Sequence, residues 1–294
     1  MTHPRVAFLG LGTMGLPMAL RLARRGFVLR VWNRSSDRMR PLLEAGAVGA
    51  STPREAASEA DVVITMLTGG EVVAEVLFGS EGAASAGAAG KLFVDMSTTG
   101  PRAANELAAR LGAAGARFVD APVSGSRQPA EAGELLVLAG GAASDLAELS
   151  PIFEVIAKRV ITAGPVGAGQ RLKVVLNGLG CQHLLAFASM LRLGERAGLE
   201  RAVLLDAFTA GAFASPAYAA KRERVLERRY GDPDFVLELV LRDAVLCAEL
   251  QREHGLMLAT HWAAHSEVRR AVGAGLGADD LFGVERLYDE KGVP

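Results

Sequence analysis

The sequence predicts an α/β fold, in which an N-terminal Rossmann-type doubly wound parallel sheet is followed by an all-α C-terminal domain. Up to about residue 164, short apolar runs alternate with stretches of helical period, and beyond it the pattern is helical almost to the end. Apolar strands separated by helices are typical of a parallel sheet that is covered on both faces. Because the pattern changes once, we expect two domains, residues 1–164 and residues 165–294.

The expected strands are short runs rich in Val, Ile, Leu and Phe. They are RVAFLG (5–10), VLRVWN (28–33), DVVITML (61–67), KLFVDMS (91–97), ARFVDAPV (116–123) and LLVLAG (135–140). Between several of them lie helical stretches such as MGLPMALRLARRG and PRAANELAARLGAAG. The alternation ends near RVITAG (159–164), and this change marks the expected start of the helical domain.

The composition limits the classes of function. Half of the 294 residues are apolar, which is enough for two modest domains, and the formal net charge is -1. Without a basic excess to neutralise a phosphate backbone, no nucleic-acid partner is expected. The N-terminus lacks the pattern of a signal peptide, and Asn177 interrupts the most apolar run (174–191), which favours a buried helix over a membrane span. We expect a cytoplasmic protein with no membrane partner.

Neither the cysteines nor the histidines indicate a metal site. Cys181 and Cys247 form no CxxC pair, which suits a reducing compartment. His261 and His265 are four residues apart, but no third ligand is evident. Two exposed or packed helical histidines are therefore the favoured interpretation.

The hexapeptide GLGTMG follows the first expected strand and precedes a helix, as a dinucleotide-binding loop does. Gly10 allows the tight turn, Gly12 lets the backbone approach a pyrophosphate, and Gly15 lets helix and strand pack closely. The helix N-terminus supplies N–H groups and the positive end of its dipole. We therefore predict a dinucleotide site at Gly10, Leu11, Gly12, Thr13, Met14 and Gly15.

The turn after the second expected strand indicates which dinucleotide binds. The strand ends at Asn33, where an NAD-binding protein often places an acidic residue for the ribose hydroxyls. A carboxylate would repel a 2′-phosphate, whereas Arg34, Ser35 and Arg38 could bind one. A solvated turn with a serine helix cap is the alternative. We predict NADPH in preference to NADH.

Two further groups of residues follow expected strands, at the edge where open α/β sheets bind ligands. Those after the third and fourth strands are Met66, Leu67, Ser97 and Thr98. The first two of these could equally belong to the core. The other group is Ser124, Gly125 and Ser126. Clustered N–H groups and hydroxyls there could hold a small carboxylate, and an ordinary serine-glycine turn is the alternative.

A lysine lies in an apolar stretch, GQRLKVVLNG (169–178). Apolar neighbours would lower the pKa of Lys173 toward neutrality, which suits a proton donor. Asn177 is one helical turn further on and lies on the same face, where it can orient the lysine or bind substrate. From periodicity alone, the favoured alternative is a lysine that extends out of an amphipathic helix to solvent.

Three motifs, in order along nearly the whole chain, make the sequence resemble the β-hydroxyacid dehydrogenases. This family includes 3-hydroxyisobutyrate dehydrogenase and the glyoxylate/succinic semialdehyde reductases. GLGTMGLPMALRL resembles its cofactor signature, and DAPVSGSRQPAEAGELLVLAGG (120–141) its substrate-loop signature. GPVGAGQRLKVVLN (164–177) resembles its catalytic signature, with Gly164, Gly167, Gly169, Lys173 and Asn177 in register. Within the family, SGSRQPAEAG is closer to the glyoxylate/succinic semialdehyde reductases, which favour NADPH.

The resemblance implies roles for the candidate residues. Lys173 and Asn177 would be catalytic, Ser124 and Gly125 would hold the acid group of the substrate, and the residues after the third and fourth strands would flank the nicotinamide and its ribose. The segment FVLELVLRDAVLCA (235–248) resembles another family segment, in which Phe235 and Asp243 match and are expected at the substrate. Arg242 stands where the family usually has a lysine that reaches the cofactor, and arginine keeps the charge but changes its reach. By the same resemblance Ser126 and Thr98 are expected at the substrate.

These expectations describe an NADPH-dependent reductase of short aldehyde acids such as glyoxylate or succinic semialdehyde, with Lys173 as general acid or base. A 3-hydroxyisobutyrate or tartronate-semialdehyde type dehydrogenase is the nearest alternative. An imine reductase or a non-catalytic NADP-binding module is less favoured, because such relatives generally lack the lysine that this chain retains. The expected partners are a small aldehyde acid or hydroxy acid and further copies of the chain, as a homodimer or homotetramer formed through the helical half.

Overall fold

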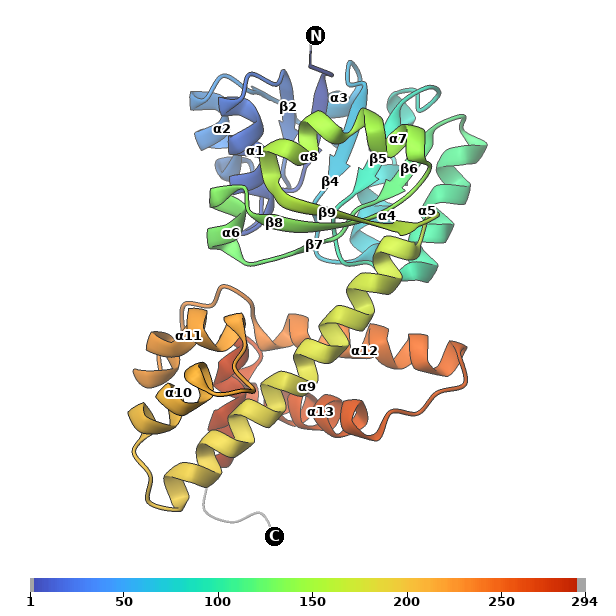
Figure 1. Cartoon of the computed structure of the whole chain (residues 1–294). Coiled ribbons are helices and arrows are strands. Elements are labelled where there is room, and N and C mark those ends of the chain that lie inside the picture. The colour runs from blue at the N-terminus through green and yellow to red at the C-terminus, as the bar shows by residue number, and fades with distance from the viewer. Residues whose placement is uncertain (1–2, 290–294) are drawn as a thin grey trace. The chain divides into compact units, whose positions relative to one another are not determined.

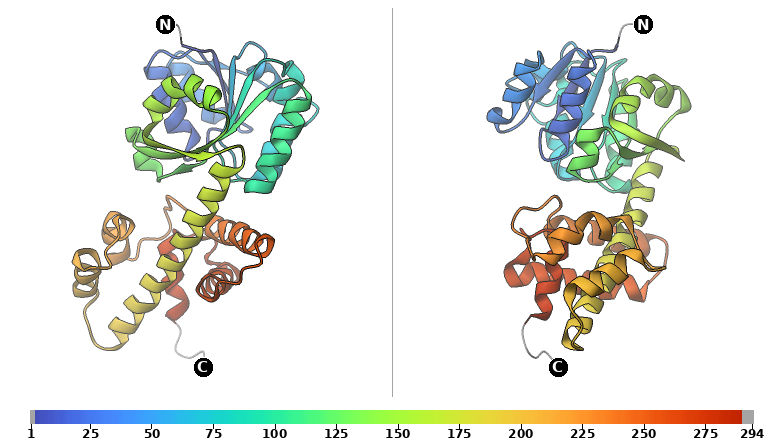
Figure 2. Two further views of the ribbon diagram at one scale, coloured as in Figure 1. Left: turned by 45° about the vertical axis from the view of Figure 1, so that its right-hand side comes forward. Right: turned by 60° about the vertical axis from the view of Figure 1, so that its left-hand side comes forward.

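The computed structural model describes residues 3–289. The chain divides into two compact units, Met1–Lys173 and Val174–Pro294, called unit 1 and unit 2 below. Figures 1 and 2 show unit 1 in blue to yellow-green and unit 2 in yellow to red. The division falls inside one long helix, so each unit contains part of that helix.

In the described part of unit 1 a single sheet has the strand order β3-β2-β1-β4-β5-β6-β8-β7, with β9 paired to β8. The strands are β1 (Val6–Leu9), β2 (Leu29–Trp32), β3 (Val48–Gly49), β4 (Val62–Thr65), β5 (Leu92–Asp95), β6 (Arg117–Asp120), β7 (Val123–Ser124), β8 (Leu135–Gly140) and β9 (Ala157–Gly164). Each apolar run expected to form a strand contains one. The order reverses direction at β1, where doubly wound sheets bind ligands.

The sheet is mostly parallel, but β8 runs antiparallel to β6 and β7. The parallel sheet that the sequence predicted is thus present, and this one reversal, which the sequence did not indicate, is explained by the connection. Parallel neighbours need a crossover of a dozen or more residues, usually through a helix that covers the sheet. After β6 the chain instead forms β7 and one short helix, so β8 returns in the opposite direction. Pro122 has no N–H to donate and separates β6 from β7 within one apolar run.

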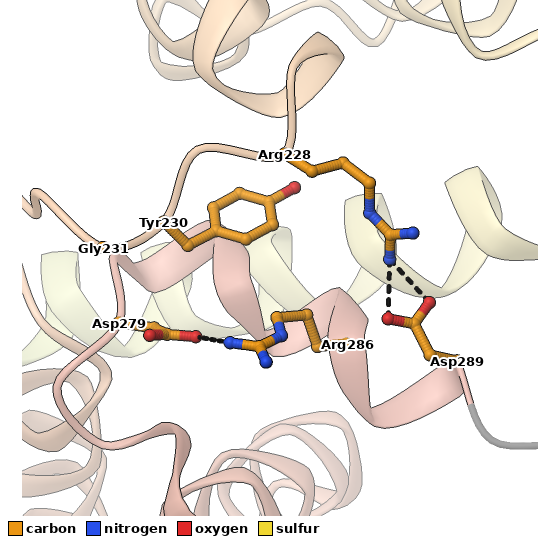
Figure 3. A pocket seen from close by; sticks show the side chains of 6 residues that line it. All are labelled: Arg228, Tyr230, Gly231, Asp279, Arg286 and Asp289. Carbon is orange, nitrogen blue, oxygen red and sulfur yellow. Dashed lines mark hydrogen bonds and ion pairs between the residues drawn. The ribbon is translucent and has the colours of Figure 1, made fainter.

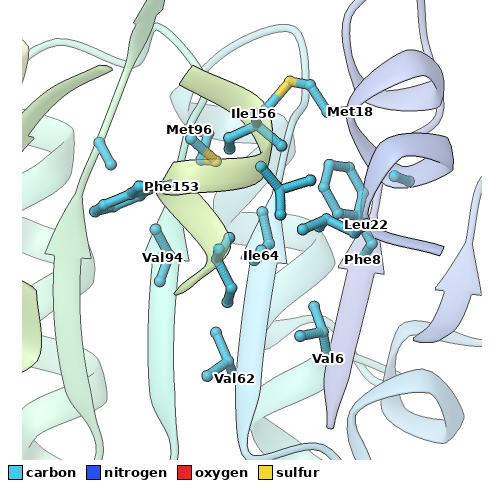
Figure 4. Packing of buried hydrophobic residues seen from close by; sticks show 14 of the residues in the cluster. Val6, Phe8, Met18, Leu22, Val62, Ile64, Val94, Met96, Phe153 and Ile156 are labelled. Carbon is cyan, nitrogen blue, oxygen red and sulfur yellow. The ribbon is translucent and has the colours of Figure 1, made fainter. Parts of the chain in front are cut away.

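Both faces of the sheet are covered, because successive side chains of a strand point to opposite faces. On one face Val6 and Phe8 pack with Met18 of α1 and Phe153 of α8, as Figure 4 shows. On the other face Ala7 and Leu9 pack with side chains from α3, α4 and α5. The helices of unit 1 are α1 (Gly15–Arg24), α2 (Arg40–Glu44), α3 (Pro53–Ala57), α4 (Gly70–Phe78), α5 (Pro101–Ala113), α6 (Arg127–Ala132), α7 (Ala143–Glu148) and α8 (Ser150–Ile156), with short 3-10 turns η1 (Ser36–Met39) and η2 (Ala83–Ala86).

Unit 2 is helical throughout its described residues, around a core that includes Phe187, Leu191 and Phe282. Its elements are the larger part of α9 (Ala168–Arg196), α10 (Arg201–Ala210), α11 (Pro216–Leu226), α12 (Leu237–Glu253), α13 (Ala259–Ala271), a π-helical turn η3 (Val272–Leu276) and η4 (Leu281–Tyr288). Among the described residues, α9 is the one helix long and apolar enough to cross a membrane, by length and composition only. Core helices of soluble proteins pass the same test, so this is weak evidence for a span.

Candidate functional site

The glycine-rich loop joins β1 to α1 and has the geometry that a dinucleotide needs. Gly10 has φ +105°, and an added Cβ there would lie 2.3 Å from the carbonyl oxygen of Met66. An added Cβ on Gly15 would lie 2.0 Å from the carbonyl oxygen of Gly10, so helix and loop touch through backbone alone. At Gly12, by contrast, an added Cβ meets no described atom within 4 Å. The loop is therefore closed where it packs and open at its middle glycine, which fits a bound pyrophosphate.

Asn33 links this loop to the turn that follows β2. Its Oδ1 accepts a hydrogen bond from the backbone N–H of Leu11 at 2.8 Å, and its Nδ2 donates to the carbonyl of Ser35 at 3.0 Å. Arg34 and Ser35 are exposed beside it. An aspartate at position 33 could accept from Leu11 but could not donate to Ser35. The amide therefore holds a turn that presents a cation and a hydroxyl.

The carboxyl ends of β4 and β5 are joined by a buried hydrogen-bond network. The N–H of Leu67 donates to Oγ of Ser97 at 2.9 Å. The buried carboxyl of Asp95 accepts from Thr65, from the N–H of Ser97 and from the hydroxyl of Thr99. Burial raises the pKa of Asp95, although its hydrogen bonds act in the opposite direction. Met66 and Leu67 are each half-buried and pack against opposite faces of the sheet, so both keep some accessible surface.

The expected carboxylate loop follows β7. Gly125 has φ +134°, a conformation that other residues avoid, and Ser126 is the residue before α6. Arg127 forms an ion pair with Glu131 on the exposed side of this short helix. Ser124, Gly125 and Ser126 thus form one turn at the carboxyl edge of the sheet, where Thr98 follows β5.

The start of α9 is fixed to the sheet by two glycines of the catalytic signature together with Asp120 and Gln170, to which the motifs assigned no role. The carboxylate of Asp120 accepts from the N–H of Gly167 at 2.6 Å and from the N–H of Gln170 at 2.7 Å. An added Cβ on Gly169 would lie 2.3 Å from the carbonyl oxygen of Leu138, so only glycine allows this approach. Burial raises the pKa of Asp120 to about 7 against the effect of these hydrogen bonds. The sequence did contain an indication that Asp120 has a role, because it is an acidic residue at the end of an otherwise apolar strand.

Lys173 is the last residue of unit 1 and lies on α9 with only 8 % of its surface exposed. It is therefore not a lysine that extends into solvent, which periodicity alone had favoured. Asn177 follows one turn later on the same helix, at the start of unit 2.

In unit 2, Asn177, Asp243 and Arg242 form one connected group. Nδ2 of Asn177 donates to Oδ2 of Asp243 at 2.5 Å. Nε and Nη2 of Arg242 donate to Oδ1 of the same carboxylate at 2.9 and 2.6 Å. Phe235 lies outside this group, half-buried against the core of unit 2, and its carbonyl accepts from Leu281. Arg242 thus orients Asp243, and Asp243 orients Asn177.

Two further features of unit 2 are a pair of histidines and a hollow. His261 and His265 are both buried, and Nδ1 of His261 is 2.8 Å from Nε2 of Gln251. Among residues 3–289 no group of three or more His, Cys, Asp or Glu could hold a metal ion. A hollow of about 220 Å³ is lined by Arg228, Tyr230, Gly231, Asp279, Arg286 and Asp289. Its arginines are paired with Asp289 and Asp279 (Figure 3), and no predicted site residue lines it.

The fold and the loop of unit 1 define a nicotinamide-dependent oxidoreductase, and comparison with known proteins agrees. Residues 5–164 match the family model for the NAD binding domain of 6-phosphogluconate dehydrogenase. Residues 167–288 match the model described as NAD-binding of NADP-dependent 3-hydroxyisobutyrate dehydrogenase. The chain belongs to the β-hydroxyacid dehydrogenase family, the 3-hydroxyisobutyrate dehydrogenase-like oxidoreductases.

Individual relatives differ in substrate. Glyoxylate/succinic semialdehyde reductase 1 of Arabidopsis thaliana is 33% identical over 279 residues, 95% of this chain and 96% of that protein. NAD-dependent L-serine dehydrogenase of Pseudomonas aeruginosa is 32% identical over 97% of this chain and 98% of that one. The crystal structure of 3-hydroxyisobutyrate dehydrogenase from Salmonella typhimurium superposes with a TM-score of 0.90 at 28% identity, covering 98% of this chain and 100% of that one. The family resemblance read from the sequence is thus confirmed, and the named activities share hydroxy acid chemistry without fixing one substrate or one nicotinamide cofactor.

Proposed function

We propose that this protein is an NADPH-dependent reductase that converts short aldehyde acids, such as glyoxylate or succinic semialdehyde, to hydroxy acids. The observation that carries the proposal is Lys173, a buried lysine at the position that the resemblance implies is catalytic, on a helix whose start is fixed to the sheet. A bound reduced nicotinamide would supply the hydride. The chain's own residues would bind the substrate and manage its charge and its proton.

Reduction of an aldehyde places negative charge on the carbonyl oxygen. In the proposal the ammonium group of Lys173 stabilises that charge and transfers a proton to the oxygen, and in the reverse direction the neutral amine accepts the proton. Asn177, held by Asp243, is the group that orients the lysine or the substrate oxygen. The N–H groups and hydroxyls of Ser124, Gly125 and Ser126 hold the substrate's carboxylate, with Thr98 and Phe235 as further contacts.

The proposed preference for NADPH rests on the turn after β2. Arg34 and Ser35 are exposed and the residue directly after β2 is the amide Asn33, so no carboxylate at position 33 repels a 2′-phosphate. Gly10 to Gly15 would hold the pyrophosphate, and Met66, Leu67, Ser97 and Thr98 the nicotinamide end. The proposal also includes a contact between Arg242 and the cofactor. The guanidinium of Arg242 would make this contact while it is hydrogen-bonded to Asp243.

The proposal is tested by NADPH and NADH oxidation with glyoxylate, succinic semialdehyde, methylmalonate semialdehyde and tartronate semialdehyde. Turnover of the first two with NADPH supports it. Turnover restricted to the last two, or to 3-hydroxyisobutyrate with an oxidised cofactor, would reassign the enzyme to the alternative dehydrogenases. No turnover with any compound would overturn the proposal.

Lys173→Ala is the matching variant. We expect it to bind NADPH as the wild type does and to lose activity by about 10²- to 10⁴-fold, the usual contribution of general acid–base catalysis. Lys158→Ala, at an exposed lysine of β9, is the control and should keep full activity. Comparable activity in the wild type and in Lys173→Ala would remove the lysine from the mechanism.

A further inference from the structure

The carboxamide of Gln170 is fully buried and makes three hydrogen bonds to one short segment of backbone. Its Oε1 accepts from the N–H of Thr99 at 3.0 Å and from the N–H of Gly100 at 3.1 Å. Its Nε2 donates to the carbonyl of Ser97 at 2.8 Å. Glutamine is the neutral side chain that can accept and donate at this reach. Each bond left unmade would leave a polar group unpaired in the interior, so this arrangement strongly favours a single position of the loop.

The backbone of the same residue is held from the other side. The N–H of Gln170 and that of Gly167 both donate to Asp120 at the end of β6. An added Cβ on Gly140 would lie 2.6 Å from Oδ1 of Asp120 and 2.8 Å from the backbone N of Gly169. Strand, carboxylate and helix therefore leave no room for α9 to move toward the sheet.

We propose that Gln170 is a positioning residue that couples the Ser97–Gly100 segment, at the cofactor edge of the sheet, to the part of α9 that carries Lys173. Lys173 lies three positions beyond Gln170, on a neighbouring position of the same helix face. Any shift of α9 relative to the loop would therefore shift the lysine as well. Asp120 holds the helix on the sheet, and Gln170 sets its position against the loop.

The coupling extends to the strand next to the loop. Ser97, whose carbonyl accepts from Gln170, also accepts through its hydroxyl from the N–H of Leu67 after β4. The carboxyl ends of two neighbouring strands and the start of α9 are thus joined by one hydrogen-bond network. The kinetic consequence of this inference rests on the proposed function, while its structural consequence does not. A misplacement of about 1 Å can cost an enzyme about 10²-fold in rate.

The test compares Gln170→Met with Gln251→Met in the full-length protein. Gln251 is a second buried glutamine, in unit 2, whose carboxamide also accepts from a backbone N–H, that of Leu258, at 2.9 Å. Hydrogen exchange without added ligand should be about tenfold faster or more at Thr99 and Gly100 in Gln170→Met, since about 1.4 kcal/mol corresponds to a factor of ten. In Gln251→Met the exchange at these two amides should stay as in the wild type. Unchanged exchange at Thr99 and Gly100 in Gln170→Met would overturn the coupling, whatever the substrate proves to be.

With an active wild type, the two variants should also separate kinetically. Gln170→Met should lose about 10- to 100-fold in kcat, while Gln251→Met should lose only thermal stability. Wild-type kcat in a folded Gln170→Met would overturn the positioning role. If the wild type turns over no aldehyde acid, the proposed function fails and the exchange experiment still decides the coupling.

Gln170→Glu adds a readout that a purely structural role would not change. A protonated glutamic acid can accept through one oxygen and donate to Ser97 through its hydroxyl, as the carboxamide does. The carboxyls of the same network are Asp95, which accepts from Thr99, and Asp120, which accepts from the N–H of residue 170, and Lys173 lies further along α9. Burial and the two acidic neighbours favour the neutral form, so activity relative to the wild type should be close to full at low pH and fall as pH rises. A ratio that does not depend on pH would contradict the proposal.

Discussion

Asp120 is a residue whose environment has two opposing effects on its carboxyl group. Burial penalises the charged form, while two backbone N–H groups from α9 favour it, and the net effect raises the pKa to about 7. Because this folded-state pKa is above the unfolded value of 3.8, the group stabilises the fold fully below pH 3.8, and this contribution is lost as pH rises through about 7. Ionisation of Asp120 therefore opposes folding at neutral pH, even though its hydrogen bonds hold α9.

This linkage predicts how the stability of Asp120→Asn depends on pH. The asparagine keeps one acceptor oxygen but does not ionise. The variant therefore does not lose the stability that the wild type loses as pH rises toward 7. We expect the wild type to be more stable than Asp120→Asn at pH 5 and this difference to narrow by pH 8. Thermal melting at both pH values measures it, with the exposed Asp37→Asn as control. A difference that stays the same from pH 5 to pH 8 would show that Asp120 is charged in the folded protein throughout this range.

The residues after β2 predict the cofactor preference. A charge-assisted hydrogen bond contributes about 1.5–3 kcal/mol, so Arg34→Ala should weaken NADPH binding by about 10- to 100-fold and leave NADH binding nearly unchanged. Arg25→Ala, at an exposed arginine after α1, should change neither. Fluorescence titration of each cofactor gives the dissociation constants. Equal loss of affinity for both cofactors would show that Arg34 does not bind the 2′-phosphate.

At the scale of elements, two of the four glycines of α9, Gly178 and Gly180, lie in different surroundings. An added Cβ on Gly178 would lie 2.6 Å from Sγ of Cys247, whereas one on Gly180 would meet no described atom within 4 Å. Alanine favours a helix by about 0.8–1.0 kcal/mol over glycine, while overpacking costs about 1–3 kcal/mol. Gly180→Ala should therefore raise the free energy of unfolding, and Gly178→Ala should lower it.

The cause can be isolated in a double-mutant cycle with Cys247→Ala. Without the sulfur, the nearest atom of residue 247 to the new methyl group is its Cβ, at 3.5 Å, an ordinary contact. Gly178→Ala should then stabilise the Cys247→Ala background about as much as Gly180→Ala stabilises the wild type. Denaturant unfolding measures all four proteins. If Gly178→Ala destabilises both backgrounds equally, the contact with Cys247 is not the cause.

Helices and strands could be predicted from the sequence wherever buried apolar residues follow each other in a regular pattern. Continuous apolar runs such as VAFL and VVIT predicted β1 and β4, because strands covered on both faces need no polar side. The two-residue strand β3 left no such run to detect. The antiparallel direction of β8 could not be predicted from its apolar pattern, since that pattern is the same in either direction and only the chain between Asp120 and Leu135 sets it.

The candidate site was predictable to the extent that its residues occur in contiguous motifs. The spacing of Gly10, Gly12 and Gly15 follows from the tight turn and close helix packing of such a loop. The structure shows both, because an added Cβ on Gly10 or Gly15 would collide with backbone. The network of Asp120 and Gln170 joins residues 47 and 71 positions apart, and no local period records such a contact. Arg242 was expected to reach a cofactor, and its fork to Asp243 depends on rotamers that a sequence does not specify.

At the scale of the whole molecule, an exposed apolar stripe on α9 bears on how copies of the chain associate. Val175, Leu179, Met190 and Leu193 are 58%, 49%, 50% and 59% exposed, and their spacing places them along one side of the helix. Between Val174 and Leu191 the helix carries no Asp, Glu, Lys or Arg. Single exposed apolar residues are ordinary, but a row of them along one uncharged side of a helix is what an interface between copies would use. Every other copy of the chain carries the same apolar stripe and could cover it. In a two-fold symmetric dimer the stripe of one copy packs against the stripe of the other.

We therefore predict a homodimer or homotetramer that depends on this stripe. Glutamate at Leu179 and Leu193 together would place two charges in each copy's interface, and because burying them unpaired is unfavourable, the copies should separate. Light scattering coupled to size exclusion should show a monomer for the double variant and a larger assembly for the wild type. Val28→Glu, a change at an equally exposed apolar residue of unit 1 (59%), should keep the wild-type mass. Circular dichroism must show that the double variant remains helical, since only a folded monomer assigns the effect to the interface. A monomeric wild type, or a double variant that keeps its mass, would show that α9 is not where the copies meet.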